Sequence, residues 1–129
     1  MKLFFAIIIA IGAVPSDKDG AVLSFYEDTY SFPDTKEGVQ LTTNFEYENT
    51  GNKPLIFSNY KVACSCTKAI LPKDPILPGQ KGKIKVTFDT NDKYGYQSRV
   101  IAIHSNAKKS ITKLKIKVVV IPKNNQKEE

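Results

Sequence analysis

Polar and apolar residues alternate along three segments, and this pattern restricts the fold most. The odd positions of residues 39–48 carry apolar side chains, namely Val39, Leu41, Phe45 and Tyr47. The same period of two occurs in residues 83–89 and 113–120, where lysines alternate with Ile, Val, Leu or Phe. Successive side chains of a strand point to opposite sides, whereas a helix would spread these lysines around its surface. The pattern therefore predicts β-strands with one buried face.

Three shorter β-rich pieces, residues 21–26, 54–62 and 98–104, are separated by turn-forming Asn, Gly, Pro and Asp. About seven strands at short spacing predict an antiparallel β-sandwich. The segment 67–82 differs because it contains three prolines, Pro72, Pro75 and Pro78. Proline cannot donate a hydrogen bond to a neighbouring strand, so we expect a crossover or an edge there.

The N-terminal segment is typical of a secretory signal peptide. Lys2 precedes an apolar run at residues 3–11, and the small residues Gly12 and Ala13 follow. The run is about half the length of a transmembrane helix, so no membrane span is expected. We predict an exported protein, periplasmic or extracellular, in four parts: signal peptide 1–13, linker 14–20, domain 21–121 and disordered tail 122–129. A buried N-terminal strand or helix is the alternative.

Cys64 and Cys66 are the two cysteines of the chain and allow three interpretations. They can pack as small apolar thiols or form an inert disulfide. A bridge between residues two apart requires a local kink, and such a bridge would exchange readily with other thiols. Two thiolates could instead bind Cu(I), with His104 as the one imidazole that could join them. His104 alternates with Ile101 and Ile103, so it is expected to face water.

Nineteen Lys and Arg against thirteen Asp and Glu give a net charge of +6. Two predicted strands carry rows of lysines that could attract an anionic surface, Lys83 and Lys85 on one and Lys113, Lys115 and Lys117 on the other. Arg99 is the single arginine, and its forked guanidinium is the group suited to specific phosphate recognition. Nucleic acid is therefore not an expected partner. We interpret the rows as solvated faces that keep sheets from aggregating.

The sequence contains no nucleophile elbow, phosphate-binding glycine loop or two-histidine zinc helix. We therefore expect no enzymatic activity and no cofactor. Tyr94 and Tyr96 flank Gly95 in a predicted turn, which makes them candidate contacts with a partner. Tyr47 lies on an apolar strand face and is expected in the core.

Several short motifs occur in a characteristic order: Asn49-Thr50-Gly51, Pro54-Leu55-Ile56, Cys64-Ser65-Cys66-Thr67, Ile76-x-Pro78-Gly79-x-x-Gly82, Phe88-Asp89 and Ser105-Asn106. In this order they resemble a family of secreted bacterial proteins known as domain of unknown function fifteen-seventy-three. That family is similar to the Hydin and major-sperm-protein group of immunoglobulin-like modules. The resemblance extends from about Ser24 to Val120. It implies an immunoglobulin-like β-sandwich and carries no enzymatic activity.

Two positions depart from the family pattern. Ser65 stands where the family usually has glycine between the cysteines, and glycine is the residue that adopts positive φ without cost. Phe32-Pro33 stands where the family has an aromatic residue and glycine, which suggests a different entry into the next strand. We expect an exported, non-catalytic binding or structural module whose partner is a protein or a cell-envelope component. The alternative is a thiol-dependent redox or Cu(I)-handling protein that uses Cys64-Ser65-Cys66.

Overall fold

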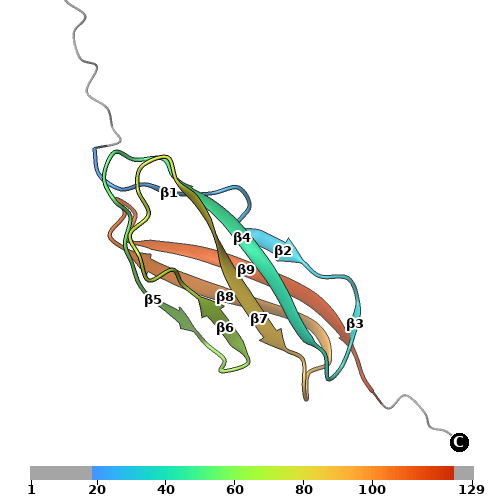
Figure 1. Ribbon diagram of the computed structural model, residues 1–129. Coiled ribbons are helices and arrows are strands. Elements are labelled where there is room, and N and C mark those ends of the chain that lie inside the picture. Colours follow the sequence, from blue (N-terminus) through green and yellow to red (C-terminus); the bar gives the residue numbers. More distant parts are fainter. Residues whose placement is uncertain (1–18, 124–129) are drawn as a thin grey trace, which may run out of the picture.

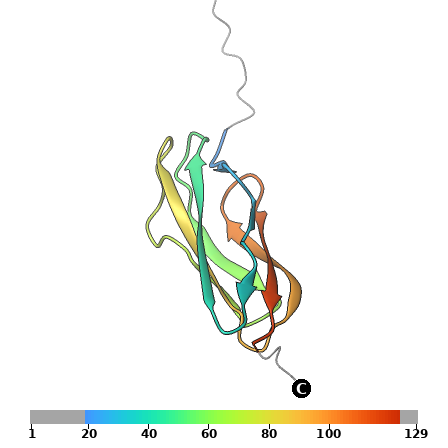
Figure 2. The same ribbon diagram turned by 90° about the vertical axis from the view of Figure 1, so that its right-hand side faces the viewer.

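The computed structural model describes residues 19–123, which form two β-sheets packed face to face (Figures 1 and 2). The strands of this part of the chain are β1 (Leu23–Phe25), β2 (Thr29–Ser31), β3 (Thr35–Lys36), β4 (Gln40–Asn49), β5 (Phe57–Val62), β6 (Thr67–Ile70), β7 (Lys81–Asp89), β8 (Gly95–Ser105) and β9 (Ile111–Ile121). The first sheet has the order β1-β4-β7-β6. The second has the order β2-β9-β8-β5, with β3 also beside β9. The predicted all-β, immunoglobulin-like sandwich is confirmed.

The segments predicted from alternation correspond to β4, β7 and β9, and the shorter pieces to β1, β5 and β8. The predicted signal peptide 1–13, most of the linker 14–20 and most of the tail 122–129 lie outside the described residues. Between residues 19 and 123 there is no helix suited to crossing a membrane. The proline-rich segment begins with β6, which pairs with β7 alone and is an edge of the first sheet, as expected.

The expected number of strands was too low, and the sandwich is not purely antiparallel. After β1 the chain crosses from the first sheet to the second, where β2 and β3 run parallel to β9. The N–H of Phe32 still donates to the Lys117 carbonyl (2.8 Å). Pro33 follows and has no N–H to donate, so the pairing is interrupted between β2 and β3. These strands are too short to show an alternating pattern.

The core lies between the inward faces of the two sheets. Figure 2 shows the ribbons of the two sheets from the side. The inward rows of β4, β7 and β9 supply most of it, namely Phe45, Tyr47, Ile84, Val86, Phe88, Leu114, Ile116, Val118 and Val120. Val39 is an exception, because it precedes β4 and is 44% exposed instead of inward-facing. The buried position predicted for Tyr47 is confirmed.

Tyr47 explains why β7 carries a glycine at position 82. The Tyr47 ring packs edge-on against Phe25 and Phe57, with centroids 5.9 and 5.2 Å away. Its hydroxyl is buried without a hydrogen-bond partner, and burial raises the pKa of this phenol. Gly82 lies directly opposite in the strand register, and a Cβ there would lie 2.7 Å from the phenol Cζ. The glycine therefore leaves room for the ring.

Asn49 organises the end of the sandwich where β1 begins. Its side chain is fully buried, and its Oδ1 accepts hydrogen bonds from the N–H groups of Gly51 (3.0 Å) and Val22 (3.3 Å). Its Nδ2 donates to the carbonyls of Lys53 (2.8 Å) and Ile76 (2.9 Å). One side chain thus satisfies four backbone groups from three separate segments. The Asn-Thr-Gly motif has a structural role here.

Two other motifs complete this end. Gly51 has no room for a side chain, because a Cβ would collide with the backbone carbonyl of Gly20. Asn106 is hydrogen-bonded to the segment that leads into β5. Its Oδ1 accepts from the Ile56 N–H (2.7 Å), and its Nδ2 donates to the Pro54 carbonyl (3.1 Å). We call this end, built on Asn49 and Asn106, the asparagine end.

Candidate functional site at the disulfide end

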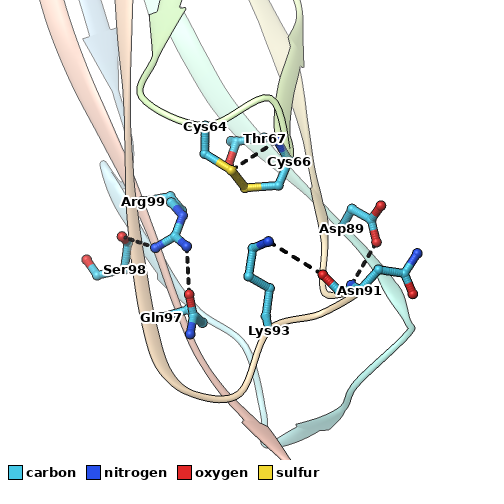
Figure 3. Close-up of a disulfide and its surroundings, with 9 residues drawn as sticks. All are labelled: Cys64, Cys66, Thr67, Asp89, Asn91, Lys93, Gln97, Ser98 and Arg99. Carbon is cyan, nitrogen blue, oxygen red and sulfur yellow. Dashed lines mark hydrogen bonds between the residues drawn. A yellow bond between two sulfur atoms is a disulfide. The ribbon is translucent and has the colours of Figure 1, made fainter.

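The cysteine pair lies at the opposite end of the sandwich, which we call the disulfide end. Cys64 and Cys66 form a disulfide in the turn between β5 and β6, where the chain crosses from the second sheet to the first (Figure 3). Their Cα atoms are 5.1 Å apart. The Thr67 N–H donates to the Cys64 carbonyl (3.2 Å), and the Asp89 N–H donates to the Cys66 carbonyl (2.8 Å). The kink expected for a bridge at this spacing is present.

Ser65 shows that the turn does not need the glycine usual in the family. Within residues 19–123, Asp92 is the one non-glycine residue with positive φ. Ser65 therefore has an ordinary negative φ, and its side chain points to solvent. Both cysteines are half-buried, so the disulfide is partly accessible.

Arg99 lies beside the disulfide and is the one arginine of the chain. Its guanidinium carbon lies 5.3 Å from the centroid of the Phe88 ring. Its Nη1 donates to the Ser98 carbonyl (2.9 Å) and its Nη2 donates to Gln97 Oε1 (2.6 Å). The Nε is buried and has no hydrogen-bond partner. Arg99 and Cys64 line the same shallow pocket of about 360 Å³.

A second cation approaches the disulfide from the loop between β7 and β8. Figure 3 shows Lys93 extending from that loop towards the turn of Cys64 and Cys66, and its Nζ donates to the Asn91 carbonyl (3.5 Å). Asn91 is held in turn by its own N–H, which donates to Asp89 Oδ1 (2.9 Å). The disulfide end therefore combines a partly accessible disulfide with two cationic side chains.

Tyr94 and Tyr96 are highly exposed, at 73% and 63% of their surface. Gly95 between them has a φ of +76°, a conformation that favours glycine, and it starts β8. The Tyr94 carbonyl accepts a hydrogen bond from Gln97 Nε2 (2.8 Å). Oε1 of the same glutamine accepts the hydrogen bond from Arg99. The two tyrosines predicted as partner contacts thus lie close to the disulfide end.

His104 is not part of this site. It faces outward on β8 as predicted, in register with Asn59 and Ile111. It is five positions beyond Arg99 on the same strand, which corresponds to about 16 Å. Among the described residues, no group of three or more His, Cys, Asp or Glu is arranged to hold a metal ion. The Cu(I) hypothesis therefore depends on the two sulfur atoms alone.

Sequence reasoning did not identify Arg99 as a site residue. The signal was present, because Arg99 is in phase with the buried residues Ile101 and Ile103 on β8. A single charged residue in a row of inward-facing apolar residues indicates a partly buried cation near the end of a strand. The position of Arg99 beside the disulfide depends on how β5, β7 and β8 pack, which the sequence pattern does not show.

The family model described as "Protein of unknown function (DUF1573)" matches residues 23–120. The chain belongs to this family. The resemblance inferred from the motifs is therefore confirmed, and the family description assigns no activity. No curated protein matches the sequence.

Three solved structures share the fold at low sequence identity. A protein of unknown function from Porphyromonas gingivalis W83 has 16% identity and a TM-score of 0.68, covering 79% of this chain and 48% of its own. The secreted serine protease VesC from Vibrio cholerae has 14% identity and a TM-score of 0.58, covering 77% and 23%. The ASH/PapD-like domain 7 of human CEP192 has 13% identity and a TM-score of 0.63, covering 90% and 97%.

The chain thus spans about half of the Porphyromonas protein and less than a quarter of VesC. These similarities show the fold.

Proposed function

We propose that this chain is an exported, non-catalytic binding or structural module, periplasmic or extracellular, that contacts its partner through the disulfide end. The observation that carries the proposal is the exposed pair Tyr94 and Tyr96, which Gln97 connects to Arg99 by hydrogen bonds to the Tyr94 carbonyl and to the guanidinium. Tyrosine is enriched in protein interfaces because it offers a large apolar ring and a polar hydroxyl at low entropic cost. The partner is a protein or another component of the cell envelope.

A capture experiment tests this role. Immobilised residues 14–129 are incubated with a cell-envelope extract, and the bound material is compared with that captured by the double variant Tyr94→Ser, Tyr96→Ser. Tyr26→Ser is the matched control, because Tyr26 is also exposed (57%) but lies near β1. We expect the double variant to lose the captured partner and the control to keep it. Equal capture by all three proteins would contradict the proposed contact surface.

Export has a separate test. Residues 1–20 are fused to alkaline phosphatase, an enzyme that matures only after export, and the N-terminus of the processed chain is sequenced. We expect phosphatase activity and cleavage after Gly12 or Ala13. An inactive fusion with an intact leader would contradict export without affecting the contact surface.

A second candidate function is thiol exchange, and the position of Arg99 favours it. The guanidinium lines the same pocket as Cys64, and a nearby cation stabilises a thiolate. In this reaction a partner dithiol supplies two electrons and two protons. The Cys64–Cys66 bond breaks to two thiols, and the partner closes its own disulfide. The reduced pair could then also bind Cu(I) through two thiolates.

Free thiols distinguish the two functions. Protein purified from an oxidising compartment is titrated for thiols before and after mild reduction, and then mixed anaerobically with one equivalent of Cu(I). The binding-module proposal predicts a disulfide that resists mild reduction and takes up no copper. Rapid exchange with a dithiol, or stoichiometric copper binding, would instead support the second candidate.

A further inference from the structure

The outer face of the second sheet carries a one-sided charge. Its strands, β2, β3, β5, β8 and β9, contain no aspartate or glutamate. They contain six cationic residues, of which Arg99 points inward. The other five lie on or beside the outer face, which we call the lysine face: Lys36, Lys61, Lys113, Lys115 and Lys117.

The strand register spaces these lysines regularly. Lys113, Lys115 and Lys117 alternate along β9, which separates neighbouring Cα atoms by about 6.7 Å. Ala102 on β8 pairs with Lys113 on one side and with Lys61 of β5 on the other. The lysine face is therefore three strands wide and extends along most of β9.

Apolar side chains are interleaved with the lysines. Tyr96, Val100, Ile111, Val119 and Ile121 are between 37% and 63% exposed. In the register Tyr96 faces Val119, and Val100 faces Lys115. The pockets that touch this face lie beside Tyr96 and Lys117, beside Val100, and beside Lys36 and Ile121, and none of these three pockets is lined by Lys61, Lys113 or Lys115. The face thus suits a broad, flat partner better than a single small ligand.

The first sheet provides an internal comparison. Two of the three lysines on β7 stand opposite glutamates on β4: Lys83 pairs with Glu46, at 4.0 Å between Nζ and Oε1, and Lys81 pairs with Glu48, whereas Lys85 pairs with Asn44. A hydrogen bond with the Tyr26 phenol, followed by the charges of that phenol and of Glu48, raises the pKa of Lys81. Lys81 and Lys83 of the first sheet therefore have acidic neighbours within the fold. The lysines of the lysine face have no acidic residue on the neighbouring strands, so a partner would supply the opposite charge.

We propose that the lysine face binds the surface of an anionic lipid bilayer. Lysine ammonium groups contact the phosphate groups of the lipids, while their alkyl stems and the interleaved Tyr, Val and Ile side chains lie at the level of the headgroups. A bilayer is flat and carries diffuse negative charge, which matches a broad face of separated point charges. The inference rests on the proposed envelope role and adds a second contact surface to the disulfide end.

The test is sedimentation with vesicles of pure phosphatidylglycerol or pure phosphatidylcholine. The protein is residues 14–129, which omits the apolar leader and keeps every core residue found within residues 19–123, since these lie between Ala21 and Val120. The test variant replaces Lys113, Lys115 and Lys117 by Gln. The matched control replaces Lys81, Lys83 and Lys85 of the first sheet by Gln, so both variants lose the same charge.

Each lysine near an anionic surface strengthens binding by about fivefold, so the test variant should bind phosphatidylglycerol about a hundredfold more weakly. The control should change by less than about fivefold, and a Lys→Arg triple at 113, 115 and 117 should bind as the wild type does. Thermal unfolding of each variant verifies the fold. Since these side chains are at the surface, midpoints close to that of the wild type are expected.

Three results would overturn the proposal. If both triple Gln variants lose the same affinity for phosphatidylglycerol vesicles, the net charge of the protein determines binding and the position of the lysines does not. Equal binding to both lipids would exclude an anionic surface as the ligand. Binding to soluble polyglutamate without binding to phosphatidylglycerol vesicles would assign the face to an acidic polymer. None of these results depends on capture by Tyr94 and Tyr96 or on cleavage of the leader, so the two proposals fail separately.

Discussion

The two ends of the sandwich use their polar groups in opposite ways. At the asparagine end, Asn49 is fully buried and all its polar atoms are hydrogen-bonded to backbone groups. At the disulfide end, Arg99 keeps a buried Nε without a partner, and Tyr94 and Tyr96 project into solvent. A satisfied buried polar group stabilises the native fold, whereas exposed tyrosine rings are accessible to a partner. The comparison separates the end that maintains the fold from the end that is available for binding.

The largest expected effect concerns the core that both ends share. Phe45→Ala and Phe88→Ala should each lower the free energy of unfolding by about 3–5 kcal/mol, because each removes a fully packed ring. Denaturant titration measures the loss. A variant that unfolds at the same denaturant concentration as the wild type would show that its ring is not in the core. Phe88 also supports Arg99, so only its variant should alter the disulfide end.

The next effect tests the comparison directly. Asn49→Ala should cost about 2–3 kcal/mol, because it removes the side-chain partner of the Val22 and Gly51 N–H groups and of the Lys53 carbonyl. Arg99→Met keeps an unbranched apolar chain as far as the position of Nε and removes the unpaired polar atom, so it should cost less than about 1 kcal/mol. Asn91→Ala is the exposed control. A larger loss for Arg99→Met than for Asn49→Ala would reverse the assigned roles.

The disulfide should contribute less than Asn49. It closes a very short loop, so the entropy that it removes from the unfolded chain is small. Replacing both Cys64 and Cys66 by Ser should lower the free energy of unfolding by about 1–2 kcal/mol. Adding reductant to the wild type should give a similar loss in the same titration. A loss as large as that of a core phenylalanine would make this turn a main determinant of the fold.

The smallest effect on stability is expected for the exposed tyrosines. Tyr94→Ser with Tyr96→Ser should change the free energy of unfolding by less than about 0.5 kcal/mol while abolishing partner capture. Thermal unfolding and the capture assay are carried out on the same preparation. Lost capture together with a large loss of stability would indicate that the rings support the fold.

Long strands were predictable because each repeats its alternation several times. Residues 39–48, 83–89 and 113–120 correspond to β4, β7 and β9, and the inward residues are those that the pattern indicated, apart from Val39. By contrast, β2, β3 and β6 have two to four residues each. They are extended because they pair with a longer strand, β2 and β3 with β9 and β6 with β7. Their own side chains carry too little periodic signal.

The candidate site was predictable only in part. The spacing of Cys64 and Cys66 indicated a kinked turn at the end of a strand, because this geometry depends on three consecutive residues. The position of Arg99 beside that turn depends on the packing of β8 against β5 and β7. The role of Asn49 likewise depends on segments up to 27 residues away.

The sequence by itself determined the all-β class, the apolar faces of the long strands and the membership of the family. Each follows from neighbours along the chain or from the order of short motifs. Only the tertiary structure decided which lysines are compensated. Glu46 meets Lys83 through the register of β4 and β7, while Lys113 and Lys115 lie beside strands without acidic residues. Charge compensation depends on distance in space, and strand pairing sets that distance.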